Sequence, residues 1–152
     1  MNNHYHLFVS ERIEGGISLF MRKLNMGYAK YFNEKYDRSG ALWQGKHRRV
    51  LIERDAHFLH IPFYIHLNPL DYSNPEWRKG EVKDMRDALE SLLVYRWSSH
   101  LDYLGVHNFP SVIRMDILNT ILGAREQYEK TIADIIQDSY LAPVSESLEY
   151  KN

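Results

Sequence analysis

The apolar residues of this chain follow two different periods, and this change of period most narrows the folds open to it. Residues 4–9 (HYHLFV) alternate in the manner of a strand, which places His4 and His6 on the same face. From Ile17 the apolar residues recur every three or four positions, which predicts a helix to about Tyr36. The chain is therefore expected to begin with a strand followed by a helix.

The remaining elements follow from turn residues and apolar spacing. Asp55 is a suitable N-cap, and Pro62 is expected to kink the helix that follows because it removes a backbone hydrogen bond. We expect an extended segment over 41–53, a helix from Asp55 to about Leu67, a loop over 71–83, a short helix over 85–93, and a helical stretch over 111–137 that is split near Gly123.

Length and composition limit the class of protein. The chain has 152 residues, 44% of them hydrophobic and 26% charged, which is typical of a globular protein with a modest core. It contains no apolar run long enough to span a membrane, and its first ten residues do not resemble a signal peptide. Because there is no cysteine, disulfides and thiolate metal sites are excluded. We expect a cytoplasmic protein.

Positive charge is concentrated in one segment. The net charge is −1, but residues 17–54 carry nine Lys and Arg against three acids, a local net charge of +6. Such a segment in a nearly neutral chain is compatible with a phosphate-binding surface. A solvated helix face is the alternative interpretation, and charge alone favours it.

Two short patterns contain residues suited to metal and phosphate chemistry. His4 and His6 would place two imidazoles near enough to share one divalent ion, although such a pair is often incidental. Tyr64 and Asn68 lie four apart on the helix that starts at Asp55 and so share a face. An amide oxygen can serve as a third ligand, and a tyrosine beside a metal can attack phosphorus. Alternatively, Tyr64 is a core residue and Asn68 ends its helix.

Four segments together resemble one enzyme family. They are residues 1–7 (MNNHYHL), 42–48 (LWQGKHR), 64–70 (YIHLNPL) and 95–105 (YRWSSHLDYLG). In this order and spacing they resemble the single-tyrosine HUH transposases, in the branch that includes the REP-associated tyrosine transposases.

The resemblance implies a ferredoxin-like α+β fold, with a catalytic domain over residues 1–105 and a helical C-terminal extension over 106–152. It implies a DNA transposase of mobile elements: an HUH endonuclease that needs Mg²⁺ or Mn²⁺ but no nucleotide cofactor. Such an enzyme cleaves and rejoins single-stranded or hairpin DNA ends through a 5′-phosphotyrosine, and a homodimer is expected.

The resemblance also assigns roles to individual residues. His4, His6 and Asn68 match metal ligands, and Tyr64 matches the nucleophile. Five further residues are expected to bind DNA: Lys46, Arg48 and Arg49 through phosphates, and Trp43 and His47 by stacking on an unpaired base. In the alternative interpretation Trp43 is a core residue and the basic side chains are merely solvated.

The sequence departs from the family pattern in three places. Asn2 replaces a proline, and Phe63, after Pro62, replaces an arginine before the nucleophile. The strand, helix and strand that precede the histidine pair in the family are also missing. We expect either a truncation or a misassigned start, the alternative being a remnant that pairs strands in a dimer. Three hypotheses result: a transposase, a related module that binds structured DNA without cutting it, and a structural metal-binding domain.

Overall fold

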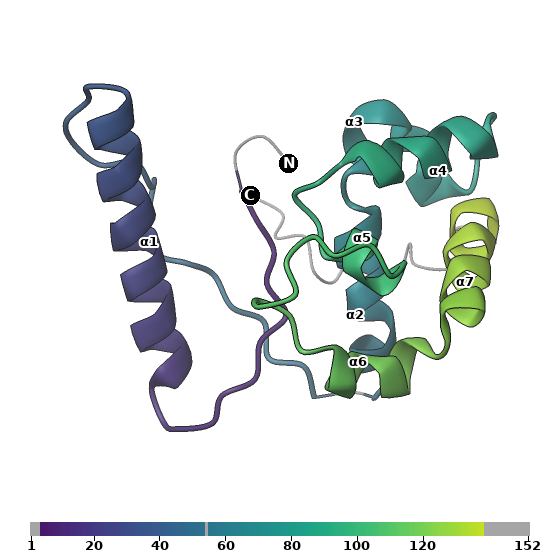
Figure 1. Cartoon of the computed structure of the whole chain (residues 1–152), viewed down its shortest axis with the longest axis horizontal. Helices are drawn as coiled ribbons and strands as arrows, with labels where there is room; N and C mark the ends of the chain where they lie inside the picture. The colour runs from purple at the N-terminus through teal and green to yellow at the C-terminus, as the bar shows by residue number, and fades with distance from the viewer. Residues whose placement is uncertain (1–3, 54, 139–152) are drawn as a thin grey trace. The chain divides into compact units, whose positions relative to one another are not determined.

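A computed structural model of the chain describes residues 4–53 and 55–138. This part of the chain is helical (Figure 1). In chain order the elements are α1 (Gly16–Lys35), α2 (Asp55–Leu67), α3 (Leu70–Ser73), the 3₁₀ helix η1 (Pro75–Lys79), α4 (Met85–Val94), α5 (His100–Tyr103), α6 (Met115–Leu122) and α7 (Arg125–Asp138).

The chain divides into two compact units, which are described separately. The smaller unit, residues 8–51, contains α1 and the segment that follows it. Gly15 adopts a positive φ of 74° before α1 begins, and the Glu11 carboxylate accepts a hydrogen bond from the Ile17 amide at 3.2 Å. Met21 is the buried residue of this helix, so most of its apolar side chains remain at least partly exposed.

The larger unit, residues 1–7 and 52–152, is built around α2. This helix is apolar on nearly all sides, and its second half, from Ile61 to Leu67, is largely buried. The other helices of the unit supply the rest of one continuous core. Its buried members are Phe63, Tyr64, Leu67, Leu70, Trp77, Ala88, Leu92, Tyr103, Leu104, Leu122, Tyr128, Ile132, Ile135 and Ile136.

The predicted helices are present. α1, α2 and α4 lie where apolar spacing placed them, and Pro62 lies inside α2. The Asp84 side chain caps α4 by accepting a hydrogen bond from the Asp87 amide at 3.1 Å. Gly123, with a φ of 73°, separates α6 from α7 as the sequence predicted.

The prediction of a ferredoxin-like α+β sheet is wrong. Residues 4–9 and 41–53 contain no strand, and no strand occurs anywhere in the two described ranges. An alternating segment becomes a strand only when its backbone N–H and C=O groups pair with a neighbouring chain segment. No such ladder is formed over residues 4–9 or 41–53, so the alternation of residues 4–9 is present without a sheet.

The loop predicted over 71–83 is also partly wrong, since α3 extends to Ser73 and η1 follows it. Trp77 of η1 is almost fully buried, which explains why this polar stretch is ordered. Among the described residues, no helix combines the length and the apolar character that crossing a membrane requires.

Candidate active site

Tyr64 of α2 lies beside the histidine pair that the sequence singled out. The Tyr64 and His6 ring centroids are 5.6 Å apart at an angle of 71°, and those of His6 and His4 are 5.1 Å apart. Tyr64 is only 2% exposed, because it lies in the buried second half of α2. The structure therefore places the expected nucleophile next to His6, which in turn contacts His4, although Tyr64 and the histidines come from distant parts of the chain.

The surroundings of His6 favour its neutral form. Burial is the main cause that lowers its pKa, and the positive charges of His4 and Arg78 lower it further. The carboxylate of Asp71 acts in the opposite direction but does not prevail. A neutral imidazole keeps a nitrogen lone pair for a metal ion, so this environment suits a ligand.

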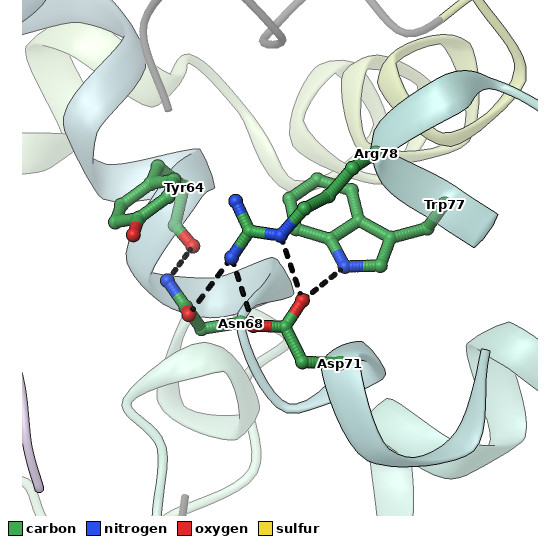
Figure 2. A network of polar contacts seen from close by, with 5 residues as sticks. All are labelled: Tyr64, Asn68, Asp71, Trp77 and Arg78. Atoms are coloured by element: carbon green, nitrogen blue, oxygen red, sulfur yellow. Dashed lines mark hydrogen bonds and ion pairs between the residues drawn. The ribbon is translucent and has the colours of Figure 1, made fainter. Parts of the chain in front are cut away.

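Asn68 is held in a network of polar contacts behind Tyr64 (Figure 2). Its amide nitrogen donates to the Tyr64 carbonyl at 3.0 Å, and its amide oxygen accepts from Arg78 Nη2 at 3.3 Å. The Arg78 guanidinium also lies over the Tyr64 ring, 5.4 Å from its centroid. Arg78 thus contacts both the predicted nucleophile and the predicted third ligand.

Asp71 fixes the position of Arg78. It accepts hydrogen bonds from Arg78 Nε at 2.9 Å and Nη2 at 2.8 Å, and from Trp77 Nε1 at 2.8 Å (Figure 2). Such a two-point contact between guanidinium and carboxylate sets orientation as well as distance. Sequence reasoning missed these three residues because it placed them in a loop. The large aromatic Trp77 in a polar stretch was the one signal available.

The predicted ligands fit a divalent ion only in part. The two histidines are neighbours and suit it, but the oxygen of Asn68 is already used by Arg78. Among the described residues, no group of three or more His, Cys, Asp or Glu side chains is placed to hold a metal. An amide oxygen has a second lone pair, so Asn68 could act as a third ligand while it keeps its contact with Arg78.

A second polar cluster lies on another side of α2. His66 Nε2 is 2.8 Å from Ser99 Oγ, and His66 Nδ1 is 2.9 Å from the Tyr128 hydroxyl. That hydroxyl is also 2.6 Å from His100 Nδ1. Burial lowers the pKa of His66 to about 3 and that of His100 to about 4, so both rings are neutral. This chain of hydrogen bonds joins α2, α5 and α7, and gives His66 a packing role.

The residues predicted to bind DNA lie in the unit of residues 8–51. Lys46, Arg48 and Arg49 are exposed, whereas Trp43 and His47 are half-buried. The Trp43 ring lies 5.8 Å from that of Tyr28 on α1. Trp43 is thus part of the packing of its unit, and its indole N–H donates to the Asn25 carbonyl at 3.0 Å.

Comparisons of the chain with protein-family models, with curated proteins and with solved structures gave no match.

Proposed function

We propose that this chain is a DNA transposase of the single-tyrosine HUH type, which cleaves and rejoins single-stranded DNA through a phosphotyrosine at Tyr64. One observation carries the proposal: the ring of Tyr64 contacts that of His6, which in turn contacts His4. The sequence motifs and the family resemblance pointed to these three residues, and all three lie in the larger unit.

The proposed reaction exchanges one phosphodiester for another. The Tyr64 oxygen forms a bond to phosphorus, and the bond from phosphorus to the 3′-oxygen breaks. The phenol loses its proton, the departing 3′-oxygen gains one, and the downstream strand remains on the tyrosine through its 5′-phosphate. Attack by a 3′-hydroxyl reverses these steps and rejoins DNA without a nucleotide cofactor.

The neighbouring residues supply what an anionic substrate needs. Mg²⁺ or Mn²⁺ held by His4 and His6 would polarise the phosphate, with the second lone pair of the Asn68 oxygen available for a third bond. The fixed charge of Arg78, beside the Tyr64 ring, reduces the repulsion between nucleophile and phosphate. In the separate unit of residues 8–51, Lys46, Arg48 and Arg49 would bind DNA phosphates, and Trp43 and His47 would stack on an unpaired base.

The proposal extends to the setting of the enzyme. It places a homodimer in the cytoplasm, acting on hairpin or single-stranded ends of a mobile element. The net charge of +6 over residues 17–54 supports a nucleic-acid partner, because the chain as a whole is nearly neutral.

A related module that binds structured DNA without cutting it is the second candidate. Two observations favour it: Tyr64 is 2% exposed, and the oxygen of Asn68 already accepts a hydrogen bond from Arg78. Catalysis requires the Tyr64 hydroxyl to reach phosphorus, whereas binding by the basic segment does not.

Two differently labelled oligonucleotides test the proposal. With Mn²⁺, a single-stranded substrate labelled at its 3′ end should give a covalent protein adduct that carries the label. The same substrate labelled at its 5′ end should give only a shorter free strand. Tyr64→Phe should abolish the adduct, while Tyr72→Phe, which changes an exposed tyrosine on α3, should retain it. Binding without any adduct, under every metal tried, would favour the second candidate.

A further inference from the structure

The unit of residues 8–51 carries a continuous row of aromatic side chains, here called the aromatic ladder: Tyr28, Tyr31, Phe32, Tyr36 and Trp43. The ring centroids of Tyr28 lie 5.8 Å from Trp43, 6.3 Å from Tyr31 and 6.1 Å from Phe32. Phe32 and Tyr36 are 4.5 Å apart. The ladder follows the last two turns of α1 and joins them to the segment after it.

One side of the ladder is anchored and the other is open. Trp43 is half-buried, and its indole N–H donates to the Asn25 carbonyl at 3.0 Å. By contrast, Tyr28 is 47% exposed, Tyr31 is 54% exposed and Tyr36 is 55% exposed. Three rings are thus held in place by their neighbours while a large part of each meets solvent.

Two cations are interleaved with these rings. Lys35 Nζ lies 5.5 Å from the ring centroids of both Tyr31 and Tyr36, and the Arg38 guanidinium lies 5.5 Å from that of Phe32. A hydrogen bond to Tyr31 is the main cause that raises the pKa of Lys35, which therefore stays charged. Aromatic faces that alternate with fixed cations match the alternating bases and phosphates of a single strand.

We propose that the aromatic ladder, with Lys35 and Arg38, binds single-stranded nucleic acid, with bases stacked on the exposed tyrosines and phosphates on the two cations. This proposal deepens the proposed function. The identification of the strand as DNA rests on that proposed function. Charge complementarity selects the occupant. A second copy would bring the same unit, in which nine Lys and Arg face four Asp and Glu, against itself in a symmetric contact, whereas a nucleic acid is anionic.

Replacing rings by aliphatic side chains of similar bulk tests the stacking. The full-length chain is titrated, in EDTA, into fluorescent oligodeoxythymidine, and anisotropy is recorded. Tyr31→Leu combined with Tyr36→Leu should weaken binding about tenfold or more, because stacking is lost. The paired Phe substitutions should stay within about twofold of the parent. Leucine is at least as good a helix former as tyrosine, so α1 should persist in circular dichroism.

The cations have a separate readout, the slope of log affinity against log salt concentration. Lys35→Gln and Arg38→Gln should each reduce the steepness of this slope by roughly 0.7, one phosphate contact each. Met26→Ala is the control, since it removes an exposed apolar side chain from α1 without removing a ring or a charge. It should change neither the affinity nor the slope.

The outcomes separate this inference from the proposed function. Equal affinities for the Leu pair, the Phe pair and the parent would overturn the inference, even if Tyr64 still forms an adduct. Loss of self-association in the Leu pair with unchanged oligonucleotide binding would assign the face to a second copy instead. If the Leu pair loses binding but no variant forms an adduct, the ladder binds a strand and the transposase proposal fails.

Discussion

Acid should destabilise the larger unit through its two buried histidines. His66 and His100 are 2% and 3% exposed, and both bond to the hydroxyl of Tyr128. Burial is the first cause that lowers the pKa of each, to about 3 for His66 and about 4 for His100, whereas an unfolded histidine titrates near 6.5. Between these values the unfolded chain binds more protons than the folded one, so falling pH favours unfolding.

The size of the effect follows from proton linkage. The contribution of each histidine is fully present above about pH 6.5 and is lost progressively as the pH falls toward the folded pKa. At pH 5 each group is about 1.5 pH units below its unfolded pKa, which costs about 2 kcal/mol per histidine and about 4 kcal/mol for the pair. Since a domain of this kind is stable by only about 5–15 kcal/mol, much of its margin would be lost.

Urea unfolding followed by circular dichroism between pH 7.5 and 5 measures this loss. The His66→Gln, His100→Gln double variant should be less stable at neutral pH but should lose about 4 kcal/mol less than the parent on acidification. His107→Gln removes an exposed histidine and should follow the parent. Comparing variants removes the contribution of carboxylates, which is common to all. If the double variant and the parent lose the same stability, the reasoning about buried neutral histidines is refuted.

Three further predictions concern the site and the core. Asp71→Asn should lower the free energy of unfolding by about 2 kcal/mol in urea titrations, because the partly buried charge of Arg78 loses its counter-ion; an unchanged midpoint would contradict this. Ile136→Ala, at a fully buried site on α7, should cost about 3 kcal/mol in the same assay, whereas Val94→Ala, which is 81% exposed, should cost less than about 0.5 kcal/mol. His6→Ala should abolish Mn²⁺ binding measured by calorimetry, and retained binding would remove this residue from the proposed ligands.

The sequence predicted the helices well because their signals are local. The apolar repeat from Ile17 and the break at Gly123 both lie within or beside the elements that they define. The sheet was predicted wrongly because a strand depends on a distant partner. Alternation over residues 4–9 records which side chains share a face, but it does not supply a pairing segment.

The candidate site was predictable only where its residues fall in a recognisable pattern. His6 and Tyr64 were selected in this way, and they are in contact. The hydrogen bonds from Arg78 and Trp77 to Asp71 could not be predicted from the sequence. They depend on how α3 and η1 fold over α2, and no spacing rule for a polar stretch predicts that arrangement.

Locating the covalent bond is the most direct test of the proposed function. The adduct formed with single-stranded DNA and Mn²⁺ is digested with nuclease and protease, and the peptide that carries a nucleotide is sequenced by mass spectrometry. We predict a 5′-phosphonucleotide on Tyr64, and none in the His4→Ala, His6→Ala variant. A nucleotide on another residue, or efficient strand cleavage with no modified peptide, would contradict the proposed mechanism.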